Sequence, residues 1–97
     1  MRFRFKKKNI EALYTEEKNA HKYPKAVVDN FFDVMSAIDA AVDSRDLRKL
    51  KGFRFEKLKG RSGERSLRLN KQWRLIVALE KDSEGNYLLI IDIEDYH

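Results

Sequence analysis

The sequence predicts a small α+β domain in which an N-terminal strand and two to three helices pack on one side of a mostly antiparallel sheet. Basic and aromatic residues alternate over 2–5, which is the period of a strand with one buried face. Apolar residues then recur at helical spacing over 27–42, and from residue 53 onward the period changes to two. A strand, two helices and four strands in a meander form one such domain, which we expect to span 1–97.

The first helix is expected soon after the N-terminal strand. Ile10, Leu13 and Tyr14 recur at helical spacing, and Asn9 precedes them as a suitable N-cap. The polar segment 15–23 that follows is expected to be a loop or a frayed helix end.

The second helix is expected to be long and to supply most of the helical layer. Pro24 suits its first turn, where the missing N–H is not needed. Its apolar stripe consists of Val27, Phe31, Met35, Ile38 and Val42. Asp43 or Ser44 then caps one further short turn, which ends near Gly52.

The C-terminal half is expected to form four strands joined by short turns. The segments expected to form these strands are 53–56, 66–69, 73–79 and 87–91. Glycine or polar clusters at 60–63, 70–72 and 82–86 provide the turns. Because the last segment is apolar on both faces from Leu88 to Ile91, we expect that strand in the interior of the sheet.

Composition excludes several classes of protein. There is no cysteine, and the two histidines are His21 and His97, so neither disulfides nor a metal site is expected. No apolar run is long enough to span a membrane, and we expect a cytoplasmic protein without a cofactor. A net charge of +5 suits a polyanion or an acidic protein partner, with a solvated basic face and no ligand as the alternative.

Two arginines flank one of the expected turns. Arg68 and Arg74 lie at similar distances from the turn at 70–72, so they are expected to be cross-strand neighbours. Two adjacent guanidinium groups repel each other unless an anion lies between them. That anion is either a surface carboxylate (Glu80, Asp92 or Glu94) or a phosphate, which matches guanidinium geometry.

An acid, a phenol and an imidazole follow the last, strongly apolar segment. Tyr96 is either a packing residue or a catalyst, and nearby Lys or Arg favours its phenolate form. Lys57 and Lys59 occupy alternate positions and are expected on one face, where a strand leaves a basic loop. His97 carries an imidazole suited to proton transfer near neutrality, or is simply a frayed last residue. Asp95 completes the candidate set.

Together these features resemble a HigB-type toxin of the RelE/ParE superfamily, over essentially the whole chain. The motifs that carry the resemblance are the basic-aromatic first strand, the long apolar helix, Leu58-Lys59-Gly60, Asn70-x-x-Trp73-Arg74-Leu75 and Asp95-Tyr96-His97. The resemblance implies a RelE-like fold and a toxin that enters the ribosomal A site and cuts mRNA without a metal. The ribose 2′-hydroxyl attacks the adjacent phosphate, which leaves a cyclic phosphate and a free 5′-hydroxyl.

The resemblance also implies partners and residue roles. The partners are a neighbouring HigA-like helix-turn-helix antitoxin, the ribosome and mRNA, with DNA reached only through the antitoxin. The implied catalytic residues are Lys59, Arg74, Asp95, Tyr96 and His97. The cations expected to bind RNA phosphates are Lys57, Arg61, Arg65 and Arg68.

One position departs from the pattern. Relatives commonly carry a histidine three residues before the corner lysine, where this chain has Glu56. A carboxylate there is either a general base or an ion-pair partner of Arg54 or Lys57. We therefore add Glu56 to the candidate catalytic residues.

Two other functions fit parts of the same pattern. A non-enzymatic ParE-like toxin, which shares the fold, inhibits DNA gyrase by binding and needs no catalytic set at Asp95-Tyr96-His97. A general RNA-binding module is the third alternative, but it requires aromatic residues exposed on the sheet, whereas Phe53, Phe55 and Trp73 are expected in the core.

Overall fold

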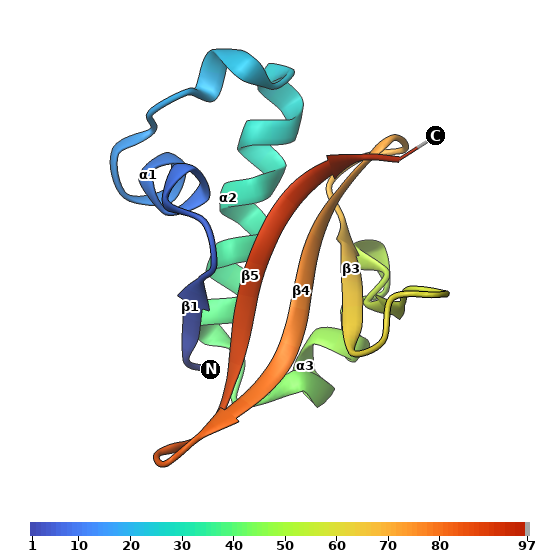
Figure 1. The fold of residues 1–97 in the computed structure, drawn as a ribbon. Coiled ribbons are helices and arrows are strands. Elements are labelled where there is room, and N and C mark those ends of the chain that lie inside the picture. Colours follow the sequence, from blue (N-terminus) through green and yellow to red (C-terminus); the bar gives the residue numbers. More distant parts are fainter. Residues whose placement is uncertain (97) are drawn as a thin grey trace.

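The computed structural model describes residues 1–96, which form a five-stranded sheet with three α-helices on one face (Figure 1). The strands are β1 (Phe3–Phe5), β2 (Glu56–Lys57), β3 (Glu64–Arg68), β4 (Trp73–Asp82) and β5 (Gly85–Asp95). The helices are α1 (Lys8–Glu16), α2 (Lys25–Ala40) and α3 (Ser44–Lys49), with short 3₁₀ turns η1 (Ala20–Lys22) and η2 (Lys51–Phe53). The predicted α+β class is confirmed. No helix within residues 1–96 is both long and apolar enough to cross a membrane.

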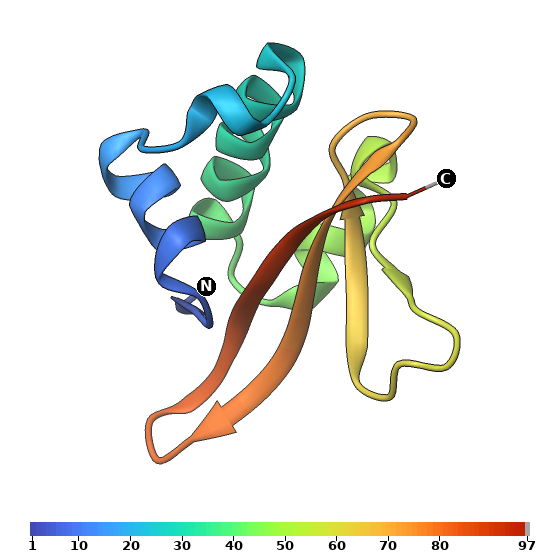
Figure 2. The same ribbon diagram turned by 45° about the horizontal axis from the view of Figure 1, so that its top comes forward.

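The strand order is β1-β5-β4-β3-β2. Strands β2 to β5 form an antiparallel meander, as predicted, and β1 pairs in parallel with β5 at the far edge. The last strand therefore has neighbours on both sides over 88–90, which confirms its predicted interior position. Figure 2 shows that the carboxyl end of β5 lies beside the turn between β3 and β4.

The core fills the space between the helices and one face of the sheet. The predicted stripe of α2 packs there, with Val27, Phe31, Met35 and Ile38 fully buried. Val42 was expected on the same stripe but is 83% exposed. The helix ends at Ala40 and the next residue is extended, so the chain leaves the helical path before Val42.

Three predicted helix starts had different outcomes. Asp43 caps α3 as expected, because its carboxylate accepts a hydrogen bond from the Arg45 backbone N–H. Pro24 is the N-cap of α2 rather than part of its first turn. Asn9 is not an N-cap, since α1 already begins at Lys8.

The expected strand over 53–56 is mostly wrong. Phe53 ends the 3₁₀ turn η2, and Arg54 adopts a left-handed conformation with φ of 46°. That conformation breaks the extended path, so β2 contains only Glu56 and Lys57. Both Phe53 and Phe55 still pack against the core, because alternation of buried residues does not require a strand.

The face of the sheet away from the helices carries a second, smaller apolar cluster. Ile76, Ala78 and Ile91 are buried there, with Leu58 and Leu89 packed against them. A β-bulge between Ile76 and the next residue of β4 shifts the register with β5 at this point. We call this side the helix-free face.

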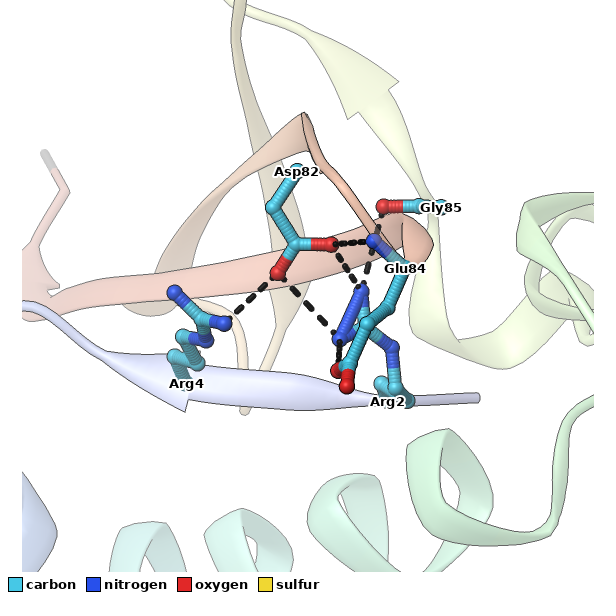
Figure 3. A network of polar contacts seen from close by, with 5 residues as sticks. All are labelled: Arg2, Arg4, Asp82, Glu84 and Gly85. Atoms are coloured by element: carbon cyan, nitrogen blue, oxygen red, sulfur yellow. Dashed lines mark hydrogen bonds and ion pairs between the residues drawn. The ribbon is translucent and has the colours of Figure 1, made fainter.

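At the hairpin end of the helix-free face, two N-terminal arginines hold the β4–β5 turn (Figure 3). Nη2 of Arg2 lies 2.7 Å from Oδ1 of Asp82, and Nη2 of Arg4 lies 2.6 Å from Oδ2 of the same carboxylate. Arg2 also pairs with Glu84 at 3.1 Å. Both guanidinium groups lie over the ring of Tyr87. The first strand is thereby tied to the hairpin as well as to β5.

Candidate functional site

The candidate site begins with the predicted arginine pair. Arg68 and Arg74 are directly opposite each other in the β3–β4 register, which confirms their expected proximity. Both side chains donate to one acceptor, the carbonyl oxygen of Asn70, from Nε of Arg68 at 3.3 Å and Nη1 of Arg74 at 2.6 Å. A shared carbonyl thus holds two like charges side by side at the end of the sheet.

The turn that supplies this carbonyl is itself fixed. Oδ1 of Asn70 accepts hydrogen bonds from the backbone N–H groups of Gln72 and Trp73, each at 2.8 Å. Nδ2 of Asn30 on α2 donates to the Leu69 carbonyl at 2.5 Å. Sequence reasoning identified 70–72 only as a turn. The signal for more was the asparagine itself, whose side chain commonly bonds to the backbone two residues ahead.

Within residues 1–96, neither guanidinium of the pair forms an ion pair with a carboxylate. Glu94 lies opposite Arg74 on β5, but its two oxygens bind Arg61 instead. Glu80 lies opposite Tyr87 at the other end of β4, and Asp92 pairs with Lys7 at 2.6 Å, so neither carboxylate binds the arginine pair. The pair therefore retains its positive charge, and both side chains remain partly accessible.

Tyr96 lies against this pair. The Cζ of Arg74 is 5.6 Å from the centre of the Tyr96 ring, in a cation–π contact. Tyr96 is 47% exposed, and its backbone N–H donates to the Gln72 carbonyl at 2.5 Å. The side chain of Gln72 donates to Oδ1 of Asp95 at 2.9 Å. The β3–β4 turn therefore holds the carboxyl end of β5 and leaves the phenol ring accessible.

The structure places Arg61 differently from the arginine pair. Its three guanidinium nitrogens each face a carboxylate oxygen: Nε donates to Glu64 at 2.8 Å, and Nη1 and Nη2 donate to Glu94 at 2.8 and 2.9 Å. These contacts, led by the hydrogen bonds to Glu94, raise the pKa of Arg61 above its ordinary value. The positive charge of Arg61 is compensated within the protein.

The remaining candidates are divided between the two faces. Glu56 lies opposite Ser66, and both side chains are on the helix-free face. Ser66 is two residues before Arg68 on β3, so Glu56 lies on the same face as the arginine pair. Lys57 and Arg65 lie opposite each other on the helix-facing side, where Arg65 lies over the Phe55 ring at 5.4 Å. The prediction that Lys57 and Lys59 share one strand face is wrong. Strand β2 ends at Lys57, and Lys59 is exposed in the turn that follows.

Other features bound the chemistry of the site. His97 lies outside the described residues. No group of three His, Cys, Asp or Glu residues within 1–96 is placed to hold a metal ion.

A hollow of about 220 Å³ lies beside Arg68. It is lined by Phe53 from η2, Asp33 from α2, Arg68 at the end of β3 and Asn70 from the turn.

Comparison with known proteins agrees with this fold and identifies the family. The family model described as a RelE-like toxin of the type II toxin–antitoxin system HigB matches residues 3–97. Toxin HigB-1 of Vibrio cholerae serotype O1 is 39% identical over 77 residues, which are 78% of this chain and 81% of that protein. The YoeB/ParE toxin from Agrobacterium tumefaciens has the same fold, with a TM-score of 0.58 at 16% identity over the full length of both chains. The chain belongs to the HigB-like family of RelE-type toxins, the toxin components of type II toxin–antitoxin systems.

Proposed function

We propose that this toxin is a ribosome-dependent mRNA endonuclease that cleaves by attack of a ribose 2′-hydroxyl on the adjacent phosphate, without a metal. The observation that carries the proposal is an arginine pair with no carboxylate partner in the described chain, held beside the accessible ring of Tyr96. Such a pair presents fixed donors to an anion that the protein itself does not supply. The ribosomal substrate makes the cytoplasm the place of action.

The arginine pair has a defined task in this reaction. Attack of the 2′-oxygen produces a pentavalent phosphorane with more negative charge than the starting diester. Arg68 and Arg74 are fixed before the reaction by the Asn70 carbonyl, so they stabilise the added charge without reorganising. Lys59 on its exposed turn is the third cation proposed to contact the phosphate.

Proton transfer is assigned to the groups at the end of β5. The phenol oxygen of Tyr96, whose ring lies beside the Arg74 guanidinium, is assigned as the general base that takes the proton of the 2′-hydroxyl. His97 or Asp95 donates a proton to the departing 5′-oxygen. Glu56 shares the helix-free face and is the alternative base. The products are a 2′,3′-cyclic phosphate and a free 5′-hydroxyl.

Partners follow in part from the family. As a type II toxin, the protein has a cognate antitoxin. We propose that this antitoxin is a HigA-like helix-turn-helix protein and that DNA is reached only through it. The ribosome supplies the orientation of the mRNA, which is consistent with a site built from few groups.

The proposal is tested by inducing the toxin in growing cells and mapping the 5′ ends of mRNA. Cleavage inside translated frames, absent when translation initiation is blocked, is the expected result. DNA damage without new mRNA ends would instead favour inhibition of gyrase, the activity of the ParE branch of the superfamily. A chemically inactive variant, Tyr96→Phe, provides the matched control for effects of overexpression.

A further inference from the structure

The loop of residues 58–63, which joins β2 to β3, crosses part of the helix-free face. Its first side chain, Leu58, packs against the apolar cluster that includes Ile76 and Ile91. The backbone N–H of Leu58 donates to the Glu64 carbonyl at 3.1 Å. The backbone N–H of Glu64 donates to the Arg61 carbonyl at 3.0 Å, and β2 pairs with β3 over two residues. We refer to residues 58–63 as the Lys59 loop.

An ion pair fastens the other half of the Lys59 loop. Nη1 and Nη2 of Arg61 bind the two oxygens of Glu94 at 2.8 and 2.9 Å, in the bidentate geometry that makes such pairs strong. The side chains are partly buried, 36% and 32% exposed. Because β4 lies between β3 and β5, Arg61 reaches across a whole strand to make this contact.

The position of Glu94 gives the ion pair its significance. Glu94 lies directly opposite Arg74 and two residues before Tyr96 on the same strand. The ion pair therefore connects the loop that carries Lys59 to the strand that carries Tyr96. Within residues 1–96, no backbone hydrogen bond joins the Lys59 loop directly to β5.

The backbone of the loop makes the ion pair necessary. Gly60 and Gly63 have φ of 74° and 77°, a region in which glycine moves freely and other residues are strained. No atom outside their chain neighbours lies within 4 Å of the place where a Cβ would be at either glycine. A loop with two unpacked glycines needs an attachment of its own to hold Lys59 in one place.

We propose that Arg61 is a positioning residue, which acts through Glu94 to fix the Lys59 loop relative to Arg74 and Tyr96. This inference rests on the proposed RNA cleavage. It differs from the phosphate-binding role that the sequence suggests for Arg61, because all three of its nitrogens already face carboxylates. Loss of the ion pair leaves each catalytic group present but lowers the fraction of molecules in which Lys59 is correctly placed.

The test combines Arg61→Ala, Glu94→Gln and the double variant with two measurements. The first is amide hydrogen exchange of Leu58 and Glu64 in the toxin alone, both of which donate backbone hydrogen bonds in the loop. The second is kcat and KM for cleavage of a defined mRNA on translating ribosomes. Arg45→Ala is the control, because it removes an ion pair with a carboxylate, Asp43, outside the Lys59 loop.

Positioning predicts that both single variants speed loop exchange and lower kcat about fivefold to tenfold, the effect of a partly buried ion pair, with KM nearly unchanged. The double variant should be no worse than either single variant, because both remove the same contact. Arg45→Ala should change neither measurement.

Other outcomes overturn the inference. If Arg61 binds phosphate, Arg61→Ala raises KM and leaves loop exchange unchanged, and Glu94→Gln lowers KM by removing a negative charge. Faster exchange with unchanged kcat would also overturn it, because the loop would then move without consequence. If the wild-type toxin cleaves no RNA, the proposed function fails, whereas loop exchange still shows whether the ion pair holds the loop.

Discussion

Two pairs of arginines lie at opposite ends of the helix-free face, and at each end an arginine lies against a tyrosine ring. At the hairpin end, Arg2 and Arg4 lie over Tyr87 at 5.7 and 4.7 Å and share the carboxylate of Asp82. At the other end, Arg74 lies 5.6 Å from the ring of Tyr96, beside Arg68. The local contacts look alike, but their charge balance differs.

The difference lies in the carboxylates. Asp82 and Glu84 neutralise the hairpin pair, so those arginines need no external anion. Among residues 1–96, the pair at the turn binds backbone carbonyl oxygens and no carboxylate, because Glu94, the acid opposite Arg74, is bound to Arg61. A compensated arginine pair joins two parts of a fold, whereas an uncompensated pair held rigidly is prepared for an anionic ligand. Matched variants of the two ends test this distinction.

The largest expected effect comes from the tyrosines. Tyr96→Phe removes the proposed proton acceptor and should lower cleavage about 10²–10⁴-fold, the usual contribution of general acid–base catalysis. Tyr87→Phe retains the ring over which Arg2 and Arg4 lie and should leave cleavage unchanged. Rates are measured on translating ribosomes with a defined mRNA. Equal rates for both variants would show that the hydroxyl of Tyr96 has no role in the reaction.

A smaller effect, on stability alone, is expected at the hairpin end. Asp82→Asn removes the charge that both arginines share and should lower the free energy of unfolding by about 1 kcal/mol, the upper range for accessible ion pairs. Glu84→Gln should cost less, because Glu84 is 75% exposed and makes one ion pair. Thermal unfolding of each variant measures the difference. Loss of cleavage in a folded Asp82→Asn protein would break the distinction between the two ends.

The smallest effect concerns Arg45, which forms a surface ion pair with Asp43. Hydrogen bonds from Arg45 hold the pKa of Asp43 below its ordinary value of 3.8. The stabilisation is therefore fully present at pH values well above 3.8 and is lost as the pH falls through the lower, folded-state pKa. Asp43→Asn keeps a residue able to cap α3 but should remove this part of the acid dependence. Acid unfolding monitored by circular dichroism compares the two proteins, and identical acid midpoints would contradict the assignment.

Local arguments predicted the central geometry of the site. The turn at 70–72 determines which residues of β3 and β4 are opposite each other, so the proximity of Arg68 and Arg74 follows from counting along the sequence. The partner of Arg74 on β5 does not follow in the same way, because the β-bulge after Ile76 shifts the register by one residue and brings Glu94 opposite Arg74. The acid, phenol and imidazole that follow the last apolar segment make Tyr96 a candidate from the sequence, and its ring lies against Arg74 in the structure.

The parts that could not be predicted depend on distant residues or on single backbone angles. The pairing of Arg61 with Glu94 depends on the path of the β2–β3 loop over the sheet and on the β-bulge in β4–β5 pairing, and no local pattern encodes either. The left-handed backbone of Arg54 interrupts the strand expected over 53–56, although nothing in the arginine side chain demands that conformation. The end of α2 before Val42 likewise depends on one residue, because the extended backbone of Ala41 ends the helix.

The most direct measurement compares Arg74→Ala with Arg4→Ala at equal concentrations of folded protein. Cleavage of a defined mRNA on translating ribosomes should fall about 10²–10³-fold for Arg74→Ala, the cost of losing a fixed donor to the transition state. Arg4→Ala should be slightly less stable yet cleave at the wild-type rate. Undiminished cleavage by a folded Arg74→Ala toxin, or an equal loss from both variants, would contradict the claim that charge balance separates the two arginine pairs.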